Sequence, residues 1–174
     1  MEIFRNSTVL ADRHEVKAAV DRMSVAINKH YENREIILLV VMTGAVMPAA
    51  WLSARLKMPL QMDFVHATRY RGGLYGAELE YRVPPRLDLE GRHVLIVDDI
   101  FDEGHTLAAI KGSVEKRKAG SVKMASLVRK DHDRGLPRDY VDFVGLDVPD
   151  VYVFGCGMDA YEEWRHLDEI LVLE

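Results

Sequence analysis

The chain has 174 residues, of which 48% are hydrophobic and 29% charged, and its formal net charge is −5 at pH 7. We expect one domain over residues 1–174, because a chain of this length can bury a sizeable core without disulfides or structural metal. The single cysteine excludes an intrachain disulfide, no apolar run is long enough to span a bilayer, and the acidic balance without a long basic run disfavours nucleic acid as a partner.

The N-terminal part of the chain predicts a helix, a strand and a second helix. Met1 to Asp12 lacks the basic start, long apolar stretch and cleavage site of a secretory signal, so we expect a cytoplasmic protein. From Asp12 onward, apolar residues recur at three- and four-residue spacing, and Asp12 with Glu15 resembles a capping box. Residues 35–42 carry the continuous apolar run of a buried strand, and a turn leads from them to a helix over residues 48–56.

A long polar stretch occupies the middle of the chain, at about residues 69–85. It contains Gly72, Gly73, Gly76 and the pair Pro84-Pro85. Structureless loops of this length inside a compact domain are usually functional or disordered. The stretch therefore predicts a flexible loop that covers a site.

The second half of the chain repeats the order of strand, loop and helix. We expect a strand over residues 93–98, a loop over 99–105, a helix from Thr106 to about Lys118 and a further strand over 122–128. Alternating strands and helices indicate an α/β fold with a mostly parallel twisted sheet flanked by helices. Ligands in such folds gather at the carboxyl ends of the strands, so the loops there are expected to hold the chemistry.

The most informative segment is VLIVDDIFDEGHTL, residues 94–107. Asp98 and Asp99 stand at the tip of the predicted strand, where carboxylates can accept hydrogen bonds from ribose hydroxyls and hold Mg²⁺. Asp102 opens a tight turn, and Gly104 lets the backbone approach an anion. Thr106 adds a hydroxyl at the start of a helix, whose free amides and positive dipole end favour phosphate. The segment thus places diol acceptors beside a phosphate-binding loop.

This segment resembles the phosphoribosyl pyrophosphate signature of type I phosphoribosyltransferases, and the chain is similar to the hypoxanthine-guanine branch along most of its length. The resemblance implies a fold with a small hood formed by the terminal segments, and an assembly of two or four copies. It implies Mg²⁺ as cofactor, and phosphoribosyl pyrophosphate and a 6-oxopurine base as substrates. It implies a 5′-phosphate loop of Asp102, Glu103, Gly104, His105 and Thr106, with the carboxylate of Glu103 pointing outward.

The same resemblance assigns roles to residues elsewhere in the chain. It implies a pyrophosphate loop, which in the family sometimes contains a cis peptide, and a hydroxyl-containing pair on the flexible loop that here reads Arg-Tyr. It also implies a base pocket within a C-terminal hood segment at about residues 142–174, where Asp159 would approach Mg²⁺ together with Asp98 and Asp99. The pyrophosphate set is Met42, Thr43, Gly44, Ala45 and Arg165, the loop pair is Arg69 and Tyr70, and the purine set is Lys130, Tyr152, Val153 and Asp159.

The expected reaction transfers the phosphoribosyl group to N9 of hypoxanthine or guanine. Lys130 supports a 6-oxopurine because lysine has only donors and gains nothing from the 6-amino group of adenine. Asp102 resembles the residue that handles a proton at purine N7. Two alternatives stay open: a different base, xanthine or adenine, on the same scaffold, and a regulator that senses phosphoribosyl pyrophosphate and binds nucleic acid.

Overall fold

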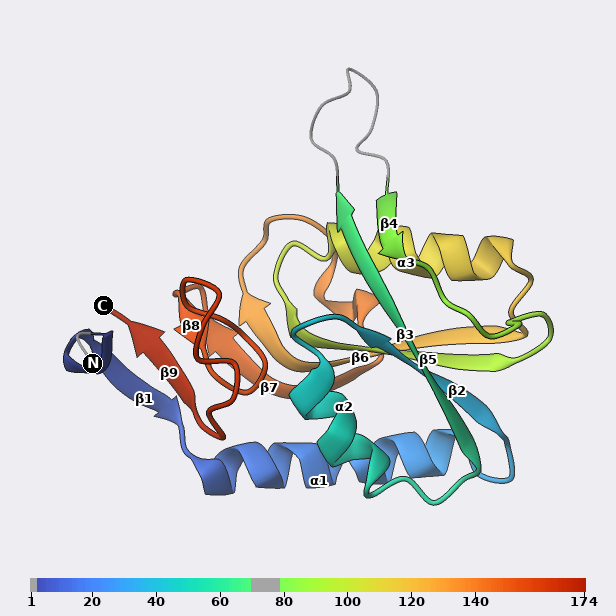
Figure 1. Ribbon diagram of the computed structural model, residues 1–174. Helices are drawn as coiled ribbons and strands as arrows, with labels where there is room; N and C mark the ends of the chain where they lie inside the picture. Colours follow the sequence, from blue (N-terminus) through green and yellow to red (C-terminus); the bar gives the residue numbers. More distant parts are fainter. Residues whose placement is uncertain (1–2, 70–78) are drawn as a thin grey trace.

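The computed structural model describes residues 3–69 and 79–174, and its body is a six-stranded sheet. The strands lie in the order β4-β3-β2-β5-β6-β7 (Figure 1). Their bounds are Ile36–Val41 for β2, Leu60–Arg69 for β3, Leu79–Val83 for β4, His93–Phe101 for β5, Ser121–Asp131 for β6 and Phe143–Pro149 for β7. All neighbouring strands run parallel except the antiparallel pair β3 and β4. This confirms the predicted α/β class with a mostly parallel sheet.

Helices cover both faces of the sheet (Figure 1). The helices α1 (Arg13–His30) and α2 (Val46–Ser53) lie on one face and α3 (His105–Lys116) on the other. The predicted capping box of α1 is present: Asp12 accepts hydrogen bonds from the amides of His14 and Glu15, and the Glu15 carboxylate accepts one from the Asp12 amide. In the described ranges, no helix combines the length and the apolar character needed to cross a membrane.

The core lies between these layers. Every residue of β2 is buried, as the continuous apolar run predicted. Burying one such aliphatic side chain contributes about 1.5–3 kcal/mol, so β2 anchors the centre of the sheet. Its carboxyl end is thereby fixed beside that of β5, with which it pairs in parallel.

A second, antiparallel sheet joins the two ends of the chain. It contains β1 (Ser7–Ala11), β9 (Ile170–Leu173) and β8 (Val153–Phe154), in the order β1-β9-β8. A short 3-10 turn at Ile3–Asn6 precedes β1, and another at Arg138–Tyr140 precedes β7. The small sheet is the hood that was expected from the terminal segments. Since Phe143–Pro149 belongs to the main sheet, the C-terminal segment contributes to the hood only after residue 149.

The sequence had suggested a loop throughout residues 69–85, but part of this stretch is a strand. Leu79–Val83 forms β4, which pairs with the end of β3. Residues 70–78, including Tyr70 of the predicted loop pair, lie outside the described residues, and Arg69 is the last residue of β3. The described part of the stretch therefore adds β4 as an antiparallel strand at the edge of the sheet (Figure 1).

The end of β5 and the start of α3, on either side of Asp102–Gly104, also differ from the prediction. Strand β5 continues to Phe101, and α3 begins at His105, one residue before Thr106. The extra strand residues pair in parallel with β6, at Val128 and Arg129. Asp98 and Asp99 are consequently held by the ladder itself, and the loop shrinks to Asp102–Gly104.

Candidate functional site

A cleft of about 580 Å³ opens at the carboxyl ends of β2 and β5. It brings together segments that are far apart in the sequence. Among its lining residues are Met42–Gly44, Asp98–Ile100, Asp102–Leu107, Asp159 and Arg165. The residues predicted to bind phosphate, pyrophosphate and metal thus face one cavity, with Ala45 buried behind its wall.

The loop Asp102–Gly104 turns the chain from β5 into α3. Gly104 adopts a left-handed conformation (φ +76°), and a Cβ at this position would overlap the ring of Phe101. Both constraints require glycine. The first amides of α3 have no partner within the helix, so the turn presents N–H groups and a positive dipole end to an anion.

Glu103 occupies the middle of this loop. Its side chain is 54% exposed, and its carboxylate lies 3.8 Å from Nε2 of His105. An exposed carboxylate can stay in water while its amide remains available to an anion. The outward orientation of Glu103 beside a bound phosphate stays a prediction.

Two adjacent carboxylates form the floor of the cleft. The amide of Asp99 donates to Oδ1 of Asp98 (3.0 Å), and the amide of Ile100 donates to Oδ1 of Asp99 (2.8 Å). Burial, followed by the neighbouring charge of Asp99, raises the pKa of Asp98 well above its ordinary value, and burial raises the pKa of Asp99. Buried like charges held side by side are relieved by a proton or by a cation.

The loop after β2 closes the opposite wall. Its Met42–Thr43 peptide bond is cis. Gly44 packs against Asp99 so closely that a Cβ would overlap the carboxylate, and a Cβ on Gly157 would overlap the carbonyl oxygen of Gly44. Glycine is therefore needed on both sides of the contact between the sheet and the hood.

Arg165 connects the hood to the carboxylates. Its Nη2 lies 2.7 Å from Oδ1 of Asp159, and its Nη1 donates to the carbonyl of Gly157 (2.8 Å) and lies 4.0 Å from Oδ2 of Asp99. The guanidinium thus stands at the edge of the cleft, where a pyrophosphate group could pair with it.

Of the predicted purine-binding residues, Asp159 lines the cleft, whereas Lys130, Tyr152 and Val153 are not among its lining residues. Lys130 Nζ lies 3.1 Å from Oδ2 of Asp102, whereas the neighbouring Arg129 forms an ion pair with Asp147. The structure therefore separates the two cations and directs Lys130 to the site. Tyr152 is half exposed and donates its hydroxyl to the carbonyl of Asp159 (3.1 Å), and Val153 is buried in β8.

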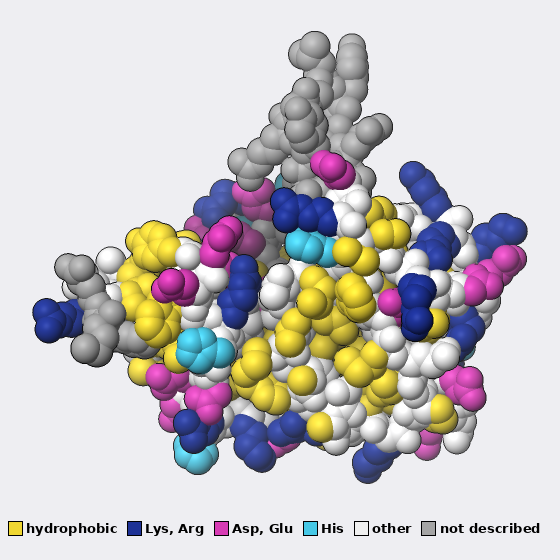
Figure 2. Space-filling view, viewed as in Figure 1, with side chains coloured by type: hydrophobic (Ala, Val, Ile, Leu, Met, Phe, Trp, Pro, Cys, Tyr) yellow, Lys and Arg dark blue, Asp and Glu magenta, His cyan; other side chains and the backbone are white. Residues whose placement is uncertain are grey.

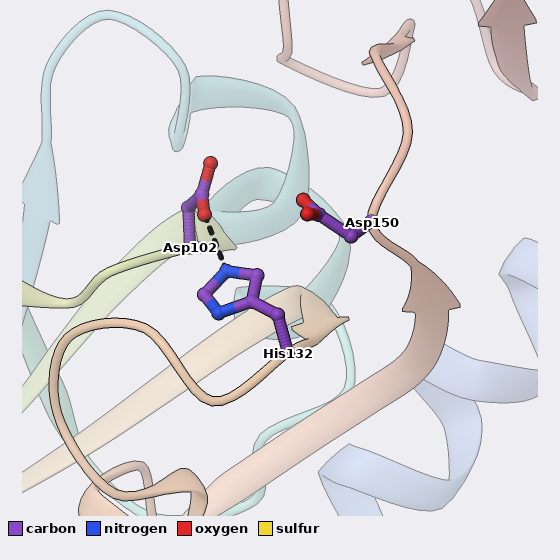
Figure 3. Close-up of side chains that lie close together, drawn as sticks. All are labelled: Asp102, His132 and Asp150. Atoms are coloured by element: carbon purple, nitrogen blue, oxygen red, sulfur yellow. Dashed lines mark hydrogen bonds and ion pairs between the residues drawn. The ribbon is translucent and has the colours of Figure 1, made fainter.

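Three residues of this wall were missed by the sequence analysis: His132, Arg134 and Asp150. The Nε2 atom of His132 lies 2.6 Å from Oδ1 of Asp102, and its side chain is 6% exposed (Figure 3). Arg134 makes a bidentate ion pair with Asp150, at 2.6 and 2.8 Å. The available signal was position, because His132 follows Lys130 by two residues at the carboxyl end of a strand.

Asp102, His132 and Asp150 lie close enough together to surround a cation. Two positive charges already face these carboxylates, since Lys130 lies within 3.1 Å of Asp102 and Arg134 within 2.6 Å of Asp150. A metal ion would have to displace both partners. We therefore regard the group as a hydrogen-bonded network.

Asp102 is held in its ionised form. Partial burial raises its pKa, but hydrogen bonds from His132 and Lys130, together with the charge of Lys130, outweigh this effect and lower the pKa below its ordinary value. A carboxylate in this environment is ionised at neutral pH, as a proton acceptor has to be.

Comparisons with known proteins agree with this geometry. The family described as "Phosphoribosyl transferase domain" matches residues 6–163. A hypoxanthine-guanine phosphoribosyltransferase of Streptococcus pneumoniae is 30% identical over 95% of this chain and 92% of its own length, and a hypoxanthine-guanine-xanthine phosphoribosyltransferase of Tritrichomonas foetus is 28% identical over 95% and 91%. A crystal structure of a hypoxanthine phosphoribosyltransferase from Staphylococcus aureus superposes with a TM-score of 0.91 at 25% identity, covering 100% of this chain and 95% of that one.

Proposed function

Because the chain belongs to the phosphoribosyltransferase family, we propose that it transfers the 5-phosphoribosyl group from phosphoribosyl pyrophosphate to N9 of hypoxanthine or guanine. The products are IMP or GMP and pyrophosphate. The observation that carries this proposal is the meeting of three segments in one cleft: the acidic pair Asp98 and Asp99, the loop before α3, and the loop after β2. Each segment matches one part of the sugar substrate, namely its diol, its 5′-phosphate and its leaving group.

The reaction forms a bond between purine N9 and C1′ as the bond from C1′ to pyrophosphate breaks. Positive charge develops on the ribose, so the protein has to position the base and stabilise the departing anion. The amides at the start of α3 would fix the 5′-phosphate, and Arg165 would pair with the pyrophosphate. The proton displaced from the purine would pass to the Asp102 carboxylate, which is kept ionised by its lowered pKa.

The donor set fits Mg²⁺ as cofactor. Asp98 and Asp99 offer adjacent oxygen ligands with raised pKa values, and hard cations prefer oxygen. Asp159 supplies a third carboxylate on the hood side of the cleft. When bound there, Mg²⁺ would neutralise charge on the pyrophosphate and ribose oxygens.

The base pocket would lie between Lys130 and the hood. Lys130 can donate to the 6-oxo group, Tyr152 can stack on the purine, and the backbone at Val153 can meet the edge of the base. Xanthine shares the 6-oxo group, and the Tritrichomonas foetus relative carries xanthine in its name. Xanthine is therefore the second candidate base, ahead of adenine.

A steady-state assay with hypoxanthine, guanine, xanthine and adenine, each with phosphoribosyl pyrophosphate and Mg²⁺, tests the function. We expect nucleotide formation from hypoxanthine or guanine, no turnover of adenine, and loss of activity when EDTA removes Mg²⁺. Binding of phosphoribosyl pyrophosphate without turnover of any base would overturn the proposal and favour a sensor. Turnover of adenine alone would contradict the role of Lys130.

We also propose that the protein forms a homodimer or homotetramer through an apolar surface beside the site. Figure 2 shows hydrophobic side chains gathered over α2 and β3. Exposed members of this surface, Val46, Met62 and Phe64, line one shallow hollow. Large apolar side chains grouped in this way are typical of protein interfaces. Sedimentation velocity is expected to show an oligomer that Phe64→Lys shifts toward the monomer, and a monomeric parent protein would contradict this assignment.

A further inference from the structure

The Asp102 carboxylate is held at both of its oxygens. Oδ1 accepts a hydrogen bond from Nε2 of His132 (2.6 Å), and Oδ2 pairs with Nζ of Lys130 (3.1 Å). Figure 3 shows the imidazole ring directed at Asp102 from the segment that follows β6. His132 is the more buried partner, with a side chain that is 6% exposed against 14% for Lys130.

The tautomer of His132 is set by its second nitrogen. The amide of Arg134 donates to Nδ1 (3.2 Å), so Nδ1 is an acceptor and carries no proton. The proton of a neutral imidazole must then sit on Nε2, where it is donated to Asp102. Arg134 is itself fixed by its bidentate ion pair with Asp150. A chain of hydrogen bonds thus runs from Asp150 through Arg134 and His132 to Asp102.

The segment that carries His132 also packs on the phosphate loop through its backbone. The amide of Leu136 donates to the carbonyl of Glu103 (3.0 Å). Gly135 has φ +79°, and a Cβ there would overlap the backbone of Glu103. His132 therefore approaches Asp102 from a segment whose position relative to the loop is already fixed.

We propose that His132 is a positioning residue for the reaction: it orients the Asp102 carboxylate toward the purine and keeps it as a proton acceptor when Lys130 turns to the base. This inference rests on the proposed function, and it extends it to a residue that touches neither substrate. Lys130 would have two partners, the 6-oxo group and Asp102. His132 would interact with Asp102 alone, so its hydrogen bond to Asp102 would persist when the purine is bound.

The direction of the pH effect follows from the charges around Asp102. Hydrogen bonds from His132 and Lys130 outweigh partial burial and lower its pKa. The Asp102 carboxylate can accept a proton only when it is ionised. Activity is therefore kept above the pKa of Asp102 and lost as the pH falls through it. Removing the His132 donor raises the pKa and moves the acid limb of the pH profile upward. The charged and titratable groups that face this network are Lys130, Arg134, Glu103 and Asp150.

The test compares His132→Phe, which removes the donor, with His132→Gln, whose amide nitrogen can donate from a similar position. For His132→Phe we expect kcat to fall about tenfold to a hundredfold, as for other residues that orient a reacting group, with the KM for phosphoribosyl pyrophosphate unchanged. The acid limb of the kcat–pH profile should shift to higher pH by about one unit, the size expected from losing one hydrogen bond to a charged group. In His132→Gln, kcat and the position of the acid limb should both return most of the way to the values of the parent protein.

A ¹³C NMR titration of the Asp102 carboxyl carbon, assigned by comparison with Asp102→Asn, gives a readout that is independent of turnover. We expect its pKa to rise in His132→Phe and to return in His132→Gln. An unchanged pKa and an unchanged acid limb would overturn the proposal. So would equal losses of kcat and of phosphoribosyl pyrophosphate affinity with a lowered melting temperature, because these indicate a structural role. If the parent protein turns over no base, the proposed function fails while the titration still decides the link between His132 and Asp102.

Discussion

Asp102→Asn is expected to lower kcat about 10²- to 10⁴-fold, the range typical of a lost general base, while the binding of phosphoribosyl pyrophosphate is retained. The asparagine can still accept the hydrogen bond from His132, so the loop should keep its shape. It cannot take the purine proton, and it loses the charge that pairs with Lys130. Rapid-quench measurement of the chemical step, together with calorimetric titration of phosphoribosyl pyrophosphate, separates these two effects.

The matched control for this variant is Asp133→Asn. Asp133 is exposed and follows His132 directly in the same segment. Replacing its carboxylate by an amide should therefore leave kcat unchanged. A parallel loss of kcat and of phosphoribosyl pyrophosphate affinity in Asp102→Asn would indicate damage to the phosphate loop and would contradict the role of base.

Gly44→Ala is expected to reduce kcat/KM by about a hundredfold, the cost of displacing a reacting centre by about one ångström. The added methyl would overlap the carboxylate of Asp99, which is 8% exposed and fixed by the amide of Ile100. Either the carboxylate or the loop has to move, and both contribute to the proposed Mg²⁺ and pyrophosphate sites. Steady-state kinetics in both directions should show a raised KM for phosphoribosyl pyrophosphate and for pyrophosphate.

Gly112→Ala provides the comparison for the same chemical change. Gly112 lies within α3, and among the described residues a Cβ there meets no atom within 4 Å apart from its chain neighbours and the nearby backbone of its own helix. Since alanine favours a helix interior over glycine, this variant should be more stable by roughly 0.5–1 kcal/mol with unchanged kinetics. Normal kinetics of Gly44→Ala would show that the contact with Asp99 does not set the geometry of the site.

The buried strands and the amphipathic helix could be predicted because their residues follow one period throughout. Strand β2 is apolar at every position, and α1 begins with an intact capping box. Strand β3 gave no such signal because Asp63 is buried, accepting from the amides of Arg86 and Leu87, while Met62 and Phe64 are exposed. This exchange of polar and apolar positions inverts the pattern from which a strand is recognised.

The candidate site could be predicted where several of its residues are adjacent in the sequence. Residues 98–106 form one motif, and all of them except Phe101 line one cleft with Gly44 and Arg165. The contribution of His132 depends on the path of the chain after β6, which returns over the phosphate loop through Gly135. No local pattern encodes such a return, because it is determined by packing between segments about 30 residues apart, as the separation of His132 and Asp102 shows.

The ion pair between Lys130 and Asp102 means that, in the proposed base pocket, the donor for the base already has an acceptor within the protein. A 6-oxopurine can take over that acceptor position, and in doing so it releases the Asp102 oxygen that is to receive the purine proton. Adenine presents an amino group there, so its entry would break the ion pair without replacing it. Under the proposed function, one exchange would therefore both select the base and free the proton acceptor, because the substrate would compete with the Asp102 carboxylate for Lys130.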